Sequence, residues 1–221
     1  MSTLTSPPVA PLLQQLFADA AQTGRKMGEM LGPMSREERT RRMSDPSADY
    51  RQFFSRVKDV HMAVSPATGA LLYMMARANR AQAIVEFGTS FGISTIHLAA
   101  ALRDNGGGTL IGSELEPTKA VRARDNLAKA GLADLVTIRE GDALETLAHD
   151  LPATIDAVLL DGHKPLYAPV LALLASRLRP GSFLVADNAD ASPDYVAQVR
   201  APGSGYVSVP FGEDVELTVK A

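Results

Sequence analysis

The chain has 221 residues, of which 46% are hydrophobic and 21% charged, so it can build one substantial core with an extension. Its formal net charge of −3 removes the electrostatic basis for nucleic-acid binding, and the absence of cysteine excludes disulfides, thiolate metal sites and cysteine nucleophiles. Because there is neither a signal-peptide pattern nor an apolar run approaching roughly 20 residues, we expect a cytoplasmic protein without membrane contact.

The first quarter of the chain is predicted to be helical. Residues 11–30 carry apolar side chains at helical spacing, and residues 50–60 form another predicted helix with the aromatic pair Phe53 and Phe54. These segments offer more apolar surface than one edge of a domain needs. We therefore expect residues 1–60 to be a helical extension that serves as a lid and as the contact surface of a homodimer.

The central part of the chain predicts a strand, a glycine-rich turn, a helix and a second strand. Ala83–Phe87 is an apolar run typical of a buried parallel strand, and the turn Gly88–Gly92 follows it. A helix is predicted over 93–102 and a strand over 109–113, which delivers Glu114 to its carboxyl end. An acid about 20 residues past a glycine turn suits the two hydroxyls of a ribose.

The type of glycine turn narrows the class of ligand. Ser90, Ser94 and Thr95 are available to cap the first turn of the helix. Gly88 and Gly92 lie four residues apart and no third glycine follows, so the pattern departs from the dinucleotide fingerprint. This disfavours an NAD-dependent oxidoreductase and favours a nucleoside without phosphate, such as S-adenosylmethionine (SAM). Similar turns also occur in α/β folds that bind no nucleotide.

Helices and strands alternate through the rest of the chain. Pro117 and Gly131 bracket a helix, and residues 206–209 and 215–219 form a predicted hairpin. Further strands are predicted at 135–139, 155–160 and 183–186. Over residues 61–221 this pattern predicts a Rossmann-like, doubly wound α/β fold, with a mostly parallel seven-stranded sheet and a C-terminal antiparallel β-hairpin.

Acidic residues recur where the predicted strands end. They are Glu86, Glu114, Asp142, Asp161 and Asp187. Because parallel strands end at the same edge of a sheet, these side chains are expected to gather where ligands bind in open α/β sheets. The sequence therefore predicts a ligand site at this edge.

Two short segments at this edge predict a metal site. Asp161, Asp187 and Asn188 offer oxygen ligands that suit Mg²⁺, Ca²⁺ or Mn²⁺. A nearby cation would favour the neutral form of Lys164, which could then act as a base. The alternative is that Asp161 caps a helix and Lys164 points to water. His163 is the histidine placed near this site.

The residues from Val85 to Gly92 resemble motif I of class I SAM-dependent methyltransferases. From about Met62 onward the chain is similar to the cation-dependent O-methyltransferases of the catechol and caffeoyl-CoA type. The resemblance implies that SAM binds to Val64, Glu86, Gly88, Ser90, Glu114, Asp142 and Asp161. In particular, Glu114 would hold the ribose hydroxyls and Asp142 the adenine amino group. It also implies that Asp161, Asp187 and Asn188 hold a divalent cation, most simply Mg²⁺, and that Lys164 is the catalytic base.

The chain departs from this family at two places. The stretch Asp161-Gly162-His163-Lys164 differs at its middle from the common D-A-D-K, and Gly212-Glu213-Asp214 replaces the usual G-D-G. The first change leaves the three metal positions intact, whereas the second puts the substrate loop, and hence the methyl acceptor, in doubt.

The expected function is methyl transfer from SAM to a hydroxyl of a small, catechol-like molecule, assisted by the cation. A metal-independent methyltransferase of the same fold, with His163 or Lys164 as base, is the nearest alternative. A nucleoside-binding regulator without turnover belongs to a different class, and the full acidic set would be unnecessary for it.

Overall fold

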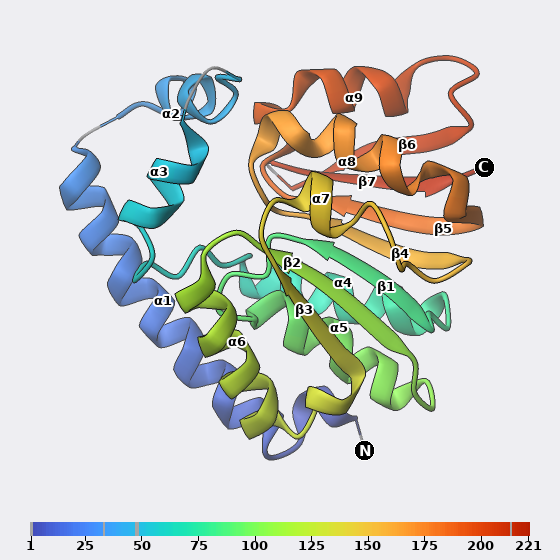
Figure 1. The fold of residues 1–221 in the computed structure, drawn as a ribbon, viewed down its shortest axis with the longest axis horizontal. Helices are drawn as coiled ribbons and strands as arrows, with labels where there is room; N and C mark the ends of the chain where they lie inside the picture. The colour runs from blue at the N-terminus through green and yellow to red at the C-terminus, as the bar shows by residue number, and fades with distance from the viewer. Residues whose placement is uncertain (1, 33, 47–48, 213) are drawn as a thin grey trace.

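The computed structural model describes residues 2–32, 34–46, 49–212 and 214–221, and within them seven strands form one sheet (Figure 1). The strands are β1 (Ala83–Phe87), β2 (Thr109–Glu114), β3 (Val136–Glu140), β4 (Ile155–Leu160), β5 (Leu178–Ala186), β6 (Tyr206–Phe211) and β7 (Val215–Lys220). Their order is β3-β2-β1-β4-β5-β7-β6. The strands β1 to β5 are parallel, and the β6–β7 hairpin adds to β5 in antiparallel fashion. The predicted fold class is confirmed.

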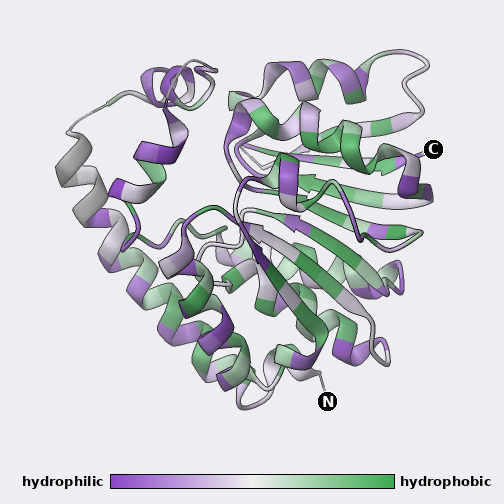
Figure 2. Cartoon of the chain, in the orientation of Figure 1, coloured by the Kyte–Doolittle hydropathy of each residue, from purple (hydrophilic) through white to green (hydrophobic). Residues whose placement is uncertain are grey.

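Helices cover both faces of the sheet. The helices are α1 (Val9–Leu31), α2 (Arg36–Met43), α3 (Tyr50–Arg56), α4 (Pro66–Ala78), α5 (Ile93–Asp104), α6 (Pro117–Ala130), α7 (Ala143–Thr146), α8 (Tyr167–Leu174) and α9 (Pro193–Arg200), and all but α2 and α3 contribute to the cores on the sheet. One core joins α1, α4, α5 and α6 to the sheet, and the other joins α7, α8 and α9 to it. Ile84 belongs to the first core and Val85 to the second, because successive strand side chains point to opposite faces. Figure 2 shows hydrophobic residues along the central strands.

Helix α1 packs on the domain itself. Its residues Val9, Leu13 and Leu16 are buried in the same core as the central strands. The apolar face of α1 is therefore used inside the chain and gives no support for a homodimer, which stays a prediction. Phe53 on α3 stays 39% exposed, so part of the apolar surface expected in the first quarter remains available.

The glycine turn is shaped by a close approach of two backbone segments. Gly88 has φ +98°, and a side chain at this position would collide with the carbonyl group of Asp161. The Asp161 N–H donates to the carbonyl of Phe87 over 2.8 Å. Glycine is required here because it adopts this φ and lets the end of β4 lie against the end of β1.

Two predicted helix boundaries have different outcomes. Helix α6 begins at Pro117 and is followed by Gly131 in the left-handed conformation, as the sequence predicts. No side chain caps α5, so the expected capping by Ser90, Ser94 or Thr95 is wrong. The hydroxyls of Ser94 and Thr95 instead donate to the buried carboxylate of Glu86, so they do not cap the start of α5.

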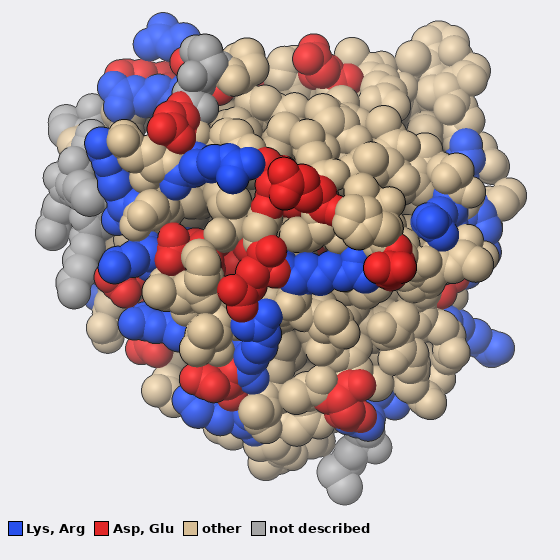
Figure 3. Space-filling view, viewed as in Figure 1, with Lys and Arg blue, Asp and Glu red and all other residues tan. Residues whose placement is uncertain are grey.

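The described helices and one face of the surface show how apolar and charged residues are distributed. Among the described residues, no helix is long and apolar enough to cross a membrane. Figure 3 shows one face of the molecule, on which the described Lys and Arg side chains are interspersed with Asp and Glu and form no continuous basic surface.

The contact between α4 and α5 provides a test of the packing. A methyl group on Gly69 would lie 2.7 Å from the buried imidazole of His97. We expect Gly69→Ala to lower the free energy of unfolding by roughly 1–3 kcal/mol, the usual cost of overpacking, although alanine favours helices. Urea denaturation measures this.

Gly24→Ala in α1 is the matched control, since nothing lies within 4 Å of the added methyl group. It should leave stability unchanged or raise it by up to about 1 kcal/mol. Equal stability of the two variants would contradict the proposed α4–α5 contact.

Candidate functional site

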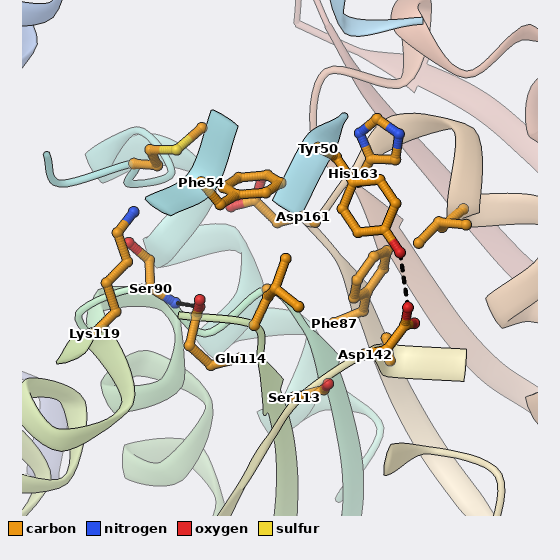
Figure 4. A pocket seen from close by; sticks show the side chains of 17 residues that line it. Tyr50, Phe54, Phe87, Ser90, Ser113, Glu114, Lys119, Asp142, Asp161 and His163 are labelled. Atoms are coloured by element: carbon orange, nitrogen blue, oxygen red, sulfur yellow. Dashed lines mark hydrogen bonds between the residues drawn. The ribbon is translucent and has the colours of Figure 1, made fainter. Parts of the chain in front are cut away.

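A cleft of about 540 Å³, which includes space open to solvent, lies beyond the carboxyl ends of β1, β2 and β4. The sequence order of the strands reverses at β1, which is where open α/β sheets bind ligands. The predicted residues Gly88, Ser90, Glu114, Asp142 and Asp161 line this cleft (Figure 4). The topology therefore brings most of the predicted cofactor residues together.

Glu114 stands at the centre of the cleft and also holds the glycine turn. Its two carboxylate oxygens accept hydrogen bonds from the N–H groups of Ser90, over 2.7 Å, and Glu116, over 2.8 Å. Burial raises its pKa, which these bonds and nearby Lys119 oppose. Each carboxylate oxygen keeps capacity for a further donor. The same carboxylate can therefore support the turn and accept a hydroxyl from a ligand.

Glu86 stabilises the glycine turn and the start of α5 through hydrogen bonds. Its fully buried carboxylate accepts hydrogen bonds from Thr89 at 3.0 Å, Ser94 at 2.7 Å and Thr95 at 2.6 Å, and burial raises its pKa to about 7. Neither Glu86 nor buried Val64 lines the cleft or the smaller cavity beside it. Their predicted contact with a cofactor stays a prediction.

Asp142 is held by the N-terminal part of the chain. The Tyr50 hydroxyl and the Arg51 guanidinium both donate to Asp142 Oδ2 over 2.7 Å, while the Leu144 N–H donates to Oδ1 over 2.9 Å. Burial alone would raise the pKa of Asp142, but these donors together hold it below its usual value. The Tyr50 ring stacks on His163 with centroids 4.5 Å apart. Helix α3 thus closes one end of the cleft.

A hydrogen-bonded chain of residues lies behind Asp161. The ammonium of buried Lys164 donates to Asp161 Oδ1 over 3.1 Å and to the Tyr167 hydroxyl over 2.7 Å. Tyr167 donates in turn to the backbone carbonyl of Asp187, also over 2.7 Å. Lys164 therefore does not point to water, and the Asp161 carboxylate bonds to Lys164 rather than capping the short helix that follows.

The carboxylate of Asp161 is close enough to Asp187 to raise the pKa of Asp187. Burial raises the pKa of Asp161 to about 6, while the Lys164 ammonium opposes the rise. Burial followed by repulsion from Asp161 raises the pKa of Asp187 to about 7. This repulsion is of the kind that a bound cation relieves.

Asn188 follows in the left-handed conformation, with φ +51°. Its amide nitrogen donates to Asp214 Oδ2 over 3.0 Å, which leaves the amide oxygen available. Among the described residues, no group of three or more His, Cys, Asp or Glu side chains could hold a metal. The predicted set has two carboxylates and one amide. Glu213, which departs from the family pattern, lies outside the described residues.

Sequence reasoning missed several residues of the site. Tyr50 and Arg51 come from a segment far from the cleft in sequence, and no local pattern marks them. Tyr167 follows Lys164 by three residues, a spacing that could have identified it as a partner. Lys119 lies one helical turn beyond the acidic end of β2. A lysine at such a position is expected to be exposed to solvent, but Lys119 is only 2% exposed.

The chain resembles known proteins along most of its length. A family model described as a methyltransferase domain matches residues 85–189. A catechol O-methyltransferase of Niastella koreensis is 38% identical over 130 residues, which cover 58% of this chain and 58% of that protein. Catechol O-methyltransferase B of Danio rerio is 34% identical over 173 residues, covering 75% of this chain and 64% of that protein. The matches thus span less than two thirds of these curated relatives.

A solved structure extends the comparison to nearly the whole chain. The O-methyltransferase TomG from Streptomyces achromogenes, in complex with SAM, matches with a TM-score of 0.64 and 26% identity, covering 88% of this chain and 94% of that one. Together with the parallel sheet, the glycine turn and the acid at the end of β2, these matches show that the chain is similar to class I O-methyltransferases.

Proposed function

We propose that the protein transfers a methyl group from SAM to a hydroxyl of a small, catechol-like molecule, with the help of a divalent cation. The observation that carries this proposal is the position of Asp161. Its side chain lines the cleft proposed for the cofactor, accepts a hydrogen bond from Lys164 and lies close to Asp187. One residue thus connects the cofactor site with the proposed base and the proposed metal ligands.

The cleft fits a nucleoside that carries a polar tail. Glu114 would accept hydrogen bonds from the ribose hydroxyls, and Asp142 would accept one from the adenine amino group. Gly88 would lie beneath the part of SAM that leads to the sulfur atom. Among the described side chains, the Ser90 hydroxyl oxygen is buried without a hydrogen-bond partner, and Ser90 lines the cleft. A polar ligand group would satisfy it.

The donor set suits a hard divalent cation such as Mg²⁺. Asp161, Asp187 and Asn188 offer two carboxylates and an amide oxygen, and few protein ligands leave coordination positions for substrate oxygens. The repulsion that raises the pKa of Asp187 supports this assignment, since a cation would remove it. When bound, the cation would act as a Lewis acid toward the substrate hydroxyl.

Lys164 is the proposed base. Its amine, in the neutral form, would take the proton of the substrate hydroxyl while the oxygen bonds to the methyl carbon. The carbon–sulfur bond breaks at the same time, and S-adenosylhomocysteine (SAH) leaves. Asp161 and the Tyr167 hydroxyl hold the amine of Lys164 in place. Lys164 would therefore contribute alignment as well as proton transfer.

A metal-independent methyltransferase is the second candidate. His163 lines the cleft, and burial followed by the nearby Lys164 charge lowers its pKa. Its imidazole would therefore be neutral at pH 7 and able to accept a proton. This candidate needs neither Asp187 nor Asn188.

Residues 1–60 are proposed to act as a lid over the cofactor. The contacts of Tyr50 and Arg51 with Asp142 support this role, because they use the acid proposed to bind adenine. The homodimer and the cytoplasmic location remain predictions. For the dimer, the apolar face of α1 offers no support, since it packs inside the chain.

Removal of the metal separates the two candidates. With SAM and a panel of catechols, we expect Mg²⁺-dependent methyl transfer that falls at least about 100-fold with EDTA or with Asp187→Ala. SAM affinity, measured by calorimetry, should change little, since no proposed cofactor contact uses Asp187. Asp194→Asn, an exposed acid on α9, is the control. Unchanged turnover with EDTA and in Asp187→Ala would instead favour the metal-independent reaction.

The ribose assignment is tested by Glu114→Gln. The amide can keep one of the two backbone hydrogen bonds but loses charge-assisted acceptance of the hydroxyls. We expect SAM binding to weaken by about tenfold or more, because lost hydrogen bonds to a charged group cost roughly 1–3 kcal/mol and about 1.4 kcal/mol is tenfold. Glu116→Gln removes the same charge two residues further along the chain and should have little effect. Equal SAM affinities of the two variants would contradict the assignment of Glu114 to the ribose.

The lid is tested by Tyr50→Phe. This variant keeps the ring but frees Asp142 from one donor. Because a net hydrogen bond is worth about 0.5–1.5 kcal/mol, SAM should bind about 2–10-fold more tightly. Tyr73→Phe, which removes a hydroxyl bonded to Asp104, controls for the change itself. Weaker binding of SAM would show that Tyr50 aids the cofactor rather than competing with it.

A further inference from the structure

Lys119 is a buried basic residue without an acidic partner. It lies on α6 and is only 2% exposed. Among the described residues, its ammonium has no hydrogen bond or ion pair, and its recorded contact is with the Phe91 ring, 5.7 Å from the centroid. Lysine is almost never fully buried unless it is paired, because burial of an uncompensated charge is costly. The residue therefore has the character of a binding group rather than a structural one.

The position of Lys119 fits such a role. Its side chain lines the cleft. In Figure 4, Lys119 and Ser90 lie on one side of Glu114, whereas Asp142 lies on the other. If adenine is bound near Asp142 and ribose at Glu114, the far end of the cofactor reaches Lys119. The acids nearest to its charge are Glu114, Glu116, Asp161 and Asp59, none of which is hydrogen-bonded to it.

A small cavity of about 190 Å³ adjoins this end of the cleft and carries further polar groups without partners. The imidazole of His61 stacks on Phe91 with centroids 4.0 Å apart, and its Nδ1 atom is buried. Within the described part of the chain, His61 Nδ1 and the Ser90 hydroxyl are the buried side-chain atoms that lack a hydrogen bond. Both residues line this cavity, and Ser90 also lines the cleft.

The start of helix α5 lies at the same place. Its first residues Ile93 and Ser94 line the small cavity, and no side chain caps the helix. Unpaired N–H groups and the helix dipole favour a negative group here. Together with the ammonium of Lys119 and the hydroxyl of Ser90, they form a set of donors that favours an anion over a neutral acceptor. One lysine and a neutral imidazole match a single negative charge better than a phosphate.

We propose that Lys119 and Ser90, at the start of α5, bind a carboxylate at the end of the cleft opposite Asp142. The inference rests on the proposed function, because the occupant is then the amino-acid tail of SAM. A carboxylate on the methyl acceptor has the same chemistry and is the other possible source. Lys119 would thus determine specificity for the tail and take no part in the chemical step.

Calorimetry with two ligands tests this proposal. SAH carries the amino-acid tail, whereas 5′-methylthioadenosine has the same nucleoside without it. In Lys119→Met, SAH should bind at least tenfold more weakly and methylthioadenosine as in the wild type. Lys129→Met, an exposed position on the same helix, should change neither affinity. The ligand-free Lys119→Met protein should melt at the same or a higher temperature, since it loses a buried unpaired charge.

The acceptor is tested with catechol and 3,4-dihydroxybenzoate, which differ by a carboxylate. If Lys119→Met raises KM for the dihydroxybenzoate alone and leaves SAH affinity unchanged, the carboxylate site stands and the acceptor is its occupant. An equal loss of affinity for both nucleosides, or no change in any of these quantities, contradicts the proposed carboxylate site. If wild-type SAH binding is strong in that case, the proposed function survives. Failure of the wild type to bind either nucleoside overturns both.

Discussion

The close backbone contact between the turn after β1 and the end of β4 is the constraint on which the rest of the site depends. Gly88 has no side chain to separate the two segments, and the Asp161 N–H bonds to the carbonyl of Phe87. Because of this contact, the acid that follows β4 lies beside the turn that follows β1. Lys164 and Tyr167, on the segment after Asp161, are thereby placed beside the cleft. A bulkier residue at position 88 would separate the nucleoside site from the proposed chemistry.

Buried polar groups around the glycine turn fall into two classes. The carboxylate of Glu86 is satisfied by three hydroxyls of the chain itself, so it stiffens the turn without needing a ligand. Glu114 combines both tasks, since it bonds two backbone N–H groups and still faces the cleft. Among the described residues, the Ser90 hydroxyl has no hydrogen-bond partner, and the ammonium of Lys119 has neither a hydrogen bond nor an ion pair. Because satisfied groups stabilise the fold and unsatisfied ones cost free energy, the second class marks where a ligand is expected.

The N-terminal segment joins the domain in two physically different ways. Helix α1 is part of the main core through Leu13 and Leu16, so its position is set by apolar burial. Helix α3 contacts the cleft through hydrogen bonds and an aromatic stack, with Tyr50 on Asp142 and His163. Polar contacts of this kind exchange readily with water or ligand groups, whereas the α1 contact does not. This difference is consistent with α1 acting as a rigid support and α3 as the part of the proposed lid that moves.

The sequence by itself determined the α/β fold, the glycine turn and the acids at the strand ends. These features have local signals: apolar strand runs, glycines, and Pro117 and Gly131 around α6. Only the tertiary structure decided that Glu86 is satisfied internally, that Tyr50 and Arg51 reach Asp142, and that Lys119 is buried without a partner. Hydrogen bonding between distant segments leaves no periodicity in the sequence. A lysine on a helix has the same local pattern whether its face meets water or a cleft, because burial depends on how the elements pack.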